Sequence, residues 1–389
     1  MHALAIPLVM SFAVCFLLVI TARWHGHLTL DHPVGVQKAH VVPVPRVGGL
    51  GIYMGLLATE LLAPFGNQNT MQFILLAGVP ALAVGLVEDV TKQVGVSARL
   101  IATMISGLMI CISTRISLTS VGLPFVDSLL AVPGFSILFT LFALAGLANA
   151  VNIIDGLNGL ASGSIAIAST TLGAVAWGVG DQDLAYAAAA LTMATLGFWL
   201  VNFPWGKIFM GDGGAYFAGF ALGWLAVLLP ERNPGISPWV SLLACAYPVI
   251  ETLYSMARRI KSRRSMGQPD AMHLHSLVKT QLVLRHFDHW PRWARHALAS
   301  PVIWLFAALP AALAWALSNK STSTLVVAFV GCMVIYHLFY QRLAGLAKVS
   351  PVQDTSPAPL DSWTAADASR ERPQSTPTLA AKRTLMGRE

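Results

Sequence analysis

The stretch NAVNIIDGLNGLASG, Asn149–Gly163, joins two long apolar runs, 135–150 and 160–179. Runs of this kind predict membrane-spanning helices, for which about 20 largely apolar residues suffice. The stretch carries one carboxylate, Asp155, together with three amides and three glycines. Such polar residues are costly at a membrane edge unless they bind something. The junction therefore predicts a bundle of membrane helices with a functional loop at one of its ends.

The composition extends this interpretation to the whole chain of 389 residues. Hydrophobic residues make up 55% of the chain and charged residues only 11%, whereas soluble domains carry about 25% charged residues. The four cysteines lie inside apolar runs without the spacing of a metal site or a disulfide, so we expect small buried side chains. The net charge of +7 is concentrated in a few loops, and we expect no nucleic-acid partner.

We predict an all-α polytopic membrane protein with about 11 transmembrane helices. Residues 1–346 form the transmembrane domain, and residues 347–389, rich in Ser, Thr, Pro and Ala, form a disordered cytoplasmic tail. The apolar runs fall at 4–20, 47–64, 71–87, 97–114, 135–150, 160–179, 184–201, 215–229, 237–256, 298–317 and 324–343.

The basic residues predict how these helices are oriented. All but three of the 25 lysines and arginines lie in loops that follow odd-numbered runs or in the C-terminal segment; the exceptions are Arg115, Arg232 and Lys320. Cytoplasmic loops carry the excess of Lys and Arg, so the N-terminus is expected outside and the C-terminus in the cytoplasm. The first run has neither a basic leader nor a cleavage site, and we expect it to be retained.

Two acidic motifs lie at predicted cytoplasmic helix ends. GLVEDV, residues 85–90, carries Glu88 and Asp89; two close carboxylates repel unless a cation or a proton lies between them, and Mg²⁺ is a suitable cation. MGDGG, residues 210–214, places Asp212 at a helix start, where Gly213 lets backbone approach a phosphate. The alternatives are two exposed loop acids and a simple helix cap.

Two further motifs carry basic and imidazole groups. In PRVGG, residues 45–49, Arg46 meets a phosphate or extends to the membrane surface, and the glycines open the next helix. In PDAMHLHSL, residues 269–277, His273 and His275 are too few for a zinc site, so phosphate contact suits them better. Glu251, inside an apolar run, is a further candidate for the same pocket.

Taken together, these motifs resemble the polyprenyl-phosphate N-acetylhexosamine-1-phosphate transferase family. The resemblance rests on the five stretches at 45–49, 85–90, 149–163, 210–220 and 269–277. It implies transfer of an N-acetylhexosamine 1-phosphate from a UDP-sugar to undecaprenyl phosphate with release of UMP. The reaction would initiate O-antigen or another lipid-linked envelope glycan in the bacterial inner membrane, with the site facing the cytoplasm. Mg²⁺ is the implied cofactor, with Mn²⁺ as the alternative ion.

The resemblance also implies roles for individual residues. Asp212 and Asp89 are expected as metal ligands, and Glu88, Asp89 and Asp155 as catalytic carboxylates. The expected nucleotide and phosphate contacts are Arg46, Arg99, Asn149, Asn152, Gly213, His273 and His275, and the expected structural glycines are Gly48, Gly49, Gly156 and Gly159. The chain departs from the family pattern in three places, where Glu88, Asn158 and Ser276 replace residues that relatives often have.

Three other interpretations compete with this one. The related phospho-N-acetylmuramoyl-pentapeptide transferases share most of the motifs, but the short histidine loop favours the O-antigen-initiating branch. A secondary transporter would place its polar site near the middle of the membrane rather than at helix ends. An inactive relative is suggested by Glu88 and Ser276. The expected partners are the UDP-sugar, undecaprenyl phosphate and the lipid bilayer, and a homodimer is compatible with the sequence.

Overall fold

The computed structural model describes residues 2–31, 43–63, 69–261, 272–287 and 289–349. Most of them are helical, and the strands among these residues are a two-residue antiparallel pair, β1 (Leu30–Asp31) with β2 (Val44–Pro45). The first nine helices are α1 (His2–Ile20), α2 (Ala22–Thr29), α3 (Gly49–Leu62), α4 (Thr70–Ala77), α5 (Val79–Thr91), α6 (Val96–Thr114), α7 (Pro124–Leu130), α8 (Pro133–Ile154) and α9 (Leu160–Gly178).

The second half of the chain continues the bundle. Its helices are α10 (Gln182–Asn202), α11 (Gly211–Arg232), α12 (Pro238–Ala244), α13 (Ala246–Lys261), α14 (Leu274–Leu277), the π-helix η1 (Val278–Val283), α15 (Leu284–His286), α16 (Arg292–Ala316) and α17 (Thr322–Val349). The tail that we predict as disordered lies from residue 350 on outside the described residues, although α17 extends three residues past the predicted boundary at 346.

All eleven apolar runs fall on helices, which makes the chain an all-α polytopic membrane protein. Within the described ranges, eight helices are long and apolar enough to span a bilayer alone, or ten spans if each of two bent pairs counts as one. Two of the predicted spans, those at 71–87 and 237–256, are bent. The first is broken between α4 and α5 by 40°, and the second between α12 and α13 by 79°. The run at 47–64 gives the shorter helix α3.

Helix α11 lies at the centre of the bundle. Of its most apolar window, 94% is buried, against 17% for α1 and 22% for α17. A helix that is apolar all round is stable only where other helices surround it, and α11 packs against α3, α5, α8, α9 and α10. The outer helices instead expose large apolar side chains such as Leu17 and Val327, as contact with lipid requires.

Glycines bring three of these helices together at one end of α11. A Cβ atom at Gly49 of α3 would lie 2.1 Å from the Cα of Gly214, and one at Gly85 of α5 would lie 2.5 Å from the Cα of Gly213. Gly211 is the first residue of α11 and has a positive φ of 73°, a backbone conformation that residues with a side chain rarely adopt. The glycines of three motifs therefore form one close-packed junction.

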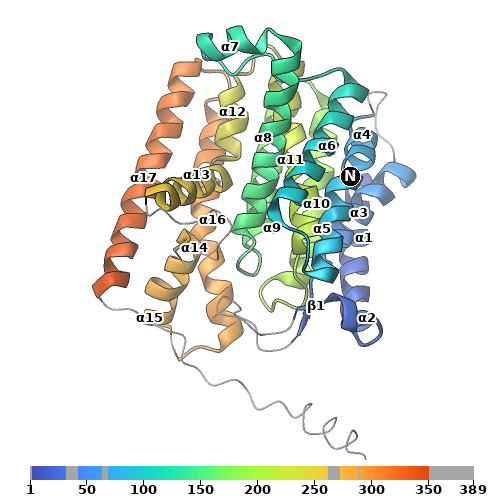
Figure 1. The fold of residues 1–389 in the computed structure, drawn as a ribbon, viewed down its shortest axis with the longest axis vertical. Coiled ribbons are helices and arrows are strands. Elements are labelled where there is room, and N and C mark those ends of the chain that lie inside the picture. The colour runs from blue at the N-terminus through green and yellow to red at the C-terminus, as the bar shows by residue number, and fades with distance from the viewer. Residues whose placement is uncertain (1, 32–42, 64–68, 262–271, 288, 350–389) are drawn as a thin grey trace, which may run out of the picture. The chain divides into compact units, whose positions relative to one another are not determined.

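The motif-bearing helix ends gather at a single end of the bundle. Figure 1 shows β1 and α2 at this end, together with the loop that follows α8, whereas α7 lies at the opposite end. Backbone hydrogen bonds join the segments directly, since Gly48 N donates to Phe209 O (2.9 Å) and Phe209 N donates to Pro45 O (2.8 Å). The PRVGG stretch is thereby fixed beside the segment that leads into α11.

Candidate active site

The Asp212 carboxylate is the point on which the site converges. It lies in the first turn of α11 and is only 6% exposed. Its Oδ1 accepts a hydrogen bond from Asn152 Nδ2 at 2.9 Å and lies 3.4 Å from Arg46 Nη2. Its Oδ2 forms an ion pair with Arg99 Nη1. Three stretches that are distant in the sequence therefore meet at one carboxylate.

Asp89 holds the start of α11 in place. This fully buried carboxylate accepts the backbone N–H of Asp212 at Oδ1 (2.8 Å) and that of Gly213 at Oδ2 (2.9 Å). The first N–H groups of a helix have no partner within the helix, and a carboxylate there both accepts them and is favoured by the helix dipole. Asp89 thus caps α11 from another helix, α5, and fixes the position of Asp212.

Arg46 links the two carboxylates. Its Nη2 lies 3.7 Å from Asp89 Oδ1, and its Nη1 lies 3.7 Å from Oδ1 of Asp31 in β1. Asp31 is 6% exposed. Sequence reasoning missed Asp31 because it stands alone before the first motif. The one hint in the sequence is that it is an acidic residue in an otherwise basic loop. Lys92, also missed, donates from Nζ to the carbonyl of Asp89 at 2.5 Å.

Arg99 and Asn149 are connected through an aromatic ring. The Arg99 guanidinium lies 5.6 Å from the ring centroid of Tyr216, one turn along α11 from Asp212, and the Tyr216 hydroxyl donates to Asn149 Oδ1 at 3.0 Å. Sequence reasoning named Arg99 and Asn149 but not Tyr216, which reads as one more apolar position of the central helix.

Asp155 lies in the turn between α8 and α9, partly exposed. Loss of hydration raises the pKa of its carboxyl from 3.8 to about 7, and Arg46 opposes the shift. Asn158, three residues on, does not face this group, because its Nδ2 donates to Pro204 O at 3.0 Å and its own carbonyl accepts from the Ser300 hydroxyl at 2.7 Å. Its amide therefore serves the fold of the turn.

Glu88 turns away from its neighbour Asp89. Its Oε2 accepts the backbone N–H of Val94 at 2.6 Å, which closes the loop between α5 and α6. Successive helical residues point about 100° apart, so the pair does not share one pocket here. The structure brings Asp89 to Asp212 and leaves Glu88 with the loop.

The two histidines border the Asp155 turn. His273 and His275 are both largely buried, with ring centroids 5.3 Å apart and ring planes 4° apart. A Cβ atom at Gly156 would lie 2.6 Å from His275 Nε2, so a side chain there would displace the ring. Gly159 has a φ of 75°, and its backbone N–H donates a hydrogen bond to Asn202 Oδ1. Gly48 packs against Phe198, where a Cβ atom would lie 2.4 Å from the ring.

The donor atoms suit a hard cation bound jointly with phosphate. Among the described residues no three His, Cys, Asp or Glu side chains cluster closely enough to hold a metal by themselves. Mg²⁺, however, is commonly bound by one or two carboxylates plus substrate phosphates. Asp212 offers such a carboxylate, and the amide oxygen of Asn152 has no hydrogen bond to the described part of the chain, since its contact with Asp212 uses the nitrogen.

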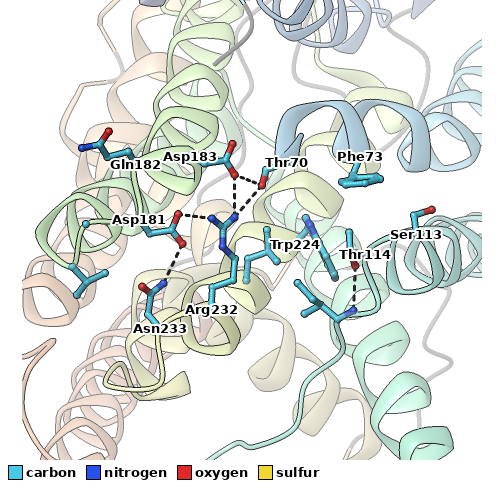
Figure 2. A pocket seen from close by; sticks show the side chains of 14 residues that line it. Thr70, Phe73, Ser113, Thr114, Asp181, Gln182, Asp183, Trp224, Arg232 and Asn233 are labelled. Atoms are coloured by element: carbon cyan, nitrogen blue, oxygen red, sulfur yellow. Dashed lines mark hydrogen bonds and ion pairs between the residues drawn. The ribbon is translucent and has the colours of Figure 1, made fainter. Parts of the chain in front are cut away.

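A second polar region lies at the other end of α11. There Arg232 Nη2 is paired with Asp181 Oδ1 at 2.7 Å and its Nη1 with Asp183 Oδ2 at 3.0 Å, while Thr70 donates to Asp183 (Figure 2). These residues line a cavity of about 1010 Å³. Sequence reasoning found no motif around them.

Comparison with known proteins gives the family. Residues 71–230 match the family described as glycosyl transferase family 4. The chain is 31% identical over 274 residues to the decaprenyl-phosphate N-acetylglucosaminephosphotransferase of Mycobacterium leprae, covering 61% of this chain and 67% of the relative. It is also similar to an Escherichia coli K12 undecaprenyl-phosphate α-N-acetylglucosaminyl 1-phosphate transferase, at 27% identity over 256 residues (64% and 68%).

A third relative is the probable undecaprenyl-phosphate N-acetylglucosaminyl 1-phosphate transferase of Bacillus subtilis, 28% identical over 247 residues (63% of this chain and 68% of the relative). The matched family region contains Asp89, Asn152, Asp155 and Asp212, whereas PRVGG and the histidine stretch lie outside it. The resemblance predicted from the motifs is confirmed, and the chain belongs to glycosyl transferase family 4, with the polyprenyl-phosphate N-acetylhexosamine-1-phosphate transferases.

Proposed function

We propose that the protein transfers an N-acetylhexosamine 1-phosphate, in the first place N-acetylglucosamine 1-phosphate, from its UDP-sugar to undecaprenyl phosphate. One observation carries the proposal. Arg46, Arg99 and Asn152, from three separate segments of the chain, converge on the single carboxylate Asp212. The relatives' names favour this reaction over the pentapeptide transferase and over transport.

The arrangement suits a reaction between two polyanions. An oxygen of the lipid phosphate attacks the β-phosphorus of the UDP-sugar, the bond from that phosphorus to the bridging oxygen breaks, and UMP leaves with that oxygen. Magnesium, when bound at Asp212 and Asn152, supplies a Lewis acid that offsets the phosphate charge. Arg46 and Arg99 lie at the same carboxylate, so their guanidinium groups are positioned to pair with phosphate oxygens as substrate enters.

The other residues have supporting roles in this proposal. Asp89 keeps Asp212 and the start of α11 in place. Asp155 orients or deprotonates a phosphate, and its raised pKa keeps it able to exchange a proton near neutrality. His273 and His275 bound the nucleotide side of the pocket. The basic loops favour a cytoplasmic position for this end, where the UDP-sugar is made, and the bacterial relatives support an inner-membrane location.

Reconstitution tests the proposal. Purified protein is incubated with undecaprenyl phosphate, labelled UDP-N-acetylglucosamine and either Mg²⁺, Mn²⁺ or a chelator, and UMP and lipid-linked product are measured. We expect equal amounts of both products, dependent on the lipid and on the divalent ion. UDP-N-acetylgalactosamine and 6-deoxy amino sugar donors are run in parallel. No UMP release with any donor, in protein that remains folded, would contradict the proposal.

A further inference from the structure

A buried carboxylate outside the proposed reaction connects three distant segments. Glu251 lies in α13, just beyond the 79° bend, and is 1% exposed. Its Oε1 accepts a hydrogen bond from His273 Nδ1 at 3.0 Å and from the backbone N–H of Leu274 at 3.1 Å. Its Oε2 accepts the hydroxyl of Tyr336, from α17, at 2.7 Å. The region matched to the family ends at residue 230, before all of these residues.

These contacts determine which nitrogen of His273 carries a proton. Oε1 already accepts the Leu274 N–H, which can only donate, so this oxygen acts as an acceptor. Nδ1 of His273 is then the protonated nitrogen, and Nε2 is the ring atom left for another partner. The tautomer of His273 is thus set from α13 rather than from within the histidine motif.

The same network extends to the candidate active site. The His273 ring stacks on His275, and His275 packs against Gly156, which directly follows Asp155. Glu251, with Tyr336, therefore contacts the histidine pair at His273, and the Asp155 turn contacts it at His275. The phenol and the carboxylate are both almost fully buried, as groups that orient another side chain commonly are.

We propose that Glu251 is a positioning residue for the nucleotide. Supported by Tyr336, it holds His273 with Nδ1 as the donor, so that Nε2 is available to a phosphate oxygen of the UDP-sugar or of UMP. This inference rests on the proposed function, since it assigns a phosphate to the histidine pair. It adds a carboxylate and a tyrosine, from two helices beyond the matched region, to the residues that determine donor binding.

The substitution Glu251→Gln tests the carboxylate directly. Glutamine keeps the volume but removes the negative charge, and its amide has one acceptor atom where the carboxylate has two, so the hydrogen bond that holds His273 loses its charge assistance. UMP binding to the purified full-length protein, measured calorimetrically, is expected to weaken about tenfold, the scale of one charge-assisted hydrogen bond. KM for the UDP-sugar should rise by a similar factor with a smaller change in kcat, and Glu251→Asp should recover part of the affinity.

A double-mutant cycle separates positioning from a merely structural role. If Glu251 acts through the ring, adding Glu251→Gln to His273→Gln leaves UMP affinity where His273→Gln alone puts it. Two losses that multiply would show that Glu251 acts independently of His273 and would overturn the inference. Unchanged affinity in Glu251→Gln would also overturn it.

Two tyrosines provide a matched pair that does not alter the carboxylate. Tyr336→Phe removes a hydroxyl that donates to Glu251, whereas Tyr247→Phe removes a buried hydroxyl of the same α13 helix that has no hydrogen-bond partner among the described residues. We expect weaker UMP binding only in Tyr336→Phe, and equal affinities in the two variants would overturn the inference. Wild-type protein that neither binds UMP nor releases it would instead contradict the proposed function.

Discussion

Helix α11 carries a polar cluster at each end, about 30 Å apart by the rise of an α-helix, and the two clusters are built differently. At the Arg232 end one guanidinium is matched by the two carboxylates Asp181 and Asp183. At the Asp212 end two guanidiniums and an amide meet one carboxylate. A cavity of about 1010 Å³ lies at the Arg232 end, where the arginine and its two carboxylates hold helix ends together.

The comparison separates a cluster that joins several sequence motifs from one that joins helix ends. At the Asp212 end the guanidiniums of Arg46 and Arg99 are shared among the carboxylates Asp31, Asp89 and Asp212, next to close-packed glycines and a helix start capped by Asp89. Carboxylates together with guanidiniums suit a phosphate that binds with a divalent cation. The Arg232 end instead ties α4, α10 and α11 together through one arginine.

The largest expected difference between the two ends comes from a pair of Asp→Asn substitutions. Asp212→Asn removes the charge on which the site converges and is expected to lower kcat by about 1000-fold, as loss of a central electrostatic group does. Asp181→Asn removes a comparable carboxylate at the other end and should leave kcat within about twofold. UMP release by equal amounts of folded protein measures both, and equal losses would contradict the comparison.

A pair of arginine substitutions is expected to give the next largest difference. Arg99→Met removes a guanidinium from Asp212 and should lower kcat/KM by about 100-fold, because a positioned phosphate contact is lost. Arg232→Met leaves Asp181 and Asp183 partly buried without their cation, so it should lower the unfolding free energy by about 2 kcal/mol with little effect on kcat/KM of the folded protein. A large loss of kcat/KM in Arg232→Met with little loss in Arg99→Met would contradict the proposed site at the Asp212 end.

The raised pKa of Asp155 predicts that kcat/KM depends on pH. Substitutions at the Arg232 end should not change this dependence. With a pKa of about 7, the carboxyl is protonated and neutral below that pH and ionised above it. If the carboxylate is the active form, kcat/KM falls about tenfold from pH 8 to pH 6. Asp155→Asn should be slow and nearly independent of pH over this range, whereas Asp183→Asn should keep the wild-type profile. A wild-type profile in Asp155→Asn would remove the carboxyl from the mechanism.

The smallest effect is expected at Glu88. Its Oε2 accepts a backbone N–H in the loop between α5 and α6, and the side-chain oxygen of glutamine can do the same. Glu88→Gln should therefore keep kcat/KM within about threefold of wild type, whereas Asp89→Asn, which alters the cap of α11, should cost considerably more. A loss in Glu88→Gln as large as that in Asp212→Asn would restore Glu88 as a catalytic carboxylate.

Sequence patterns predicted the helices and the clustering of the five motifs for a clear physical reason. Apolar runs set the spans, and loops after odd-numbered spans must share a side. The same patterns missed the break at Cys245, which has a proline only three residues later, at Pro248. They also missed Asp31 and Tyr216, because a lone acid and an aromatic residue in an apolar helix carry no spacing signal.

The different directions of the Glu88 and Asp89 side chains could not be predicted from the sequence either. Two adjacent acids at a helix end share a pocket only if the helix ends between them, and here α5 continues to Thr91. The residue that caps α11 is set by the approach of Gly85 to Gly213, a tertiary contact. Packing between helices therefore decided which of the two acids reached the site.

Photoaffinity labelling tests most directly which end of α11 binds the donor. The full-length protein is irradiated with 5-azido-UDP-N-acetylglucosamine in the presence of Mg²⁺, with excess UMP as the competitor, and the labelled peptides are mapped. We predict UMP-protected labels in the Asp155–Gly159 turn or beside His273 and His275, and none around Asp181, Asp183 or Arg232. Protected labels at the Arg232 end, with none at the Asp212 end, would contradict the account.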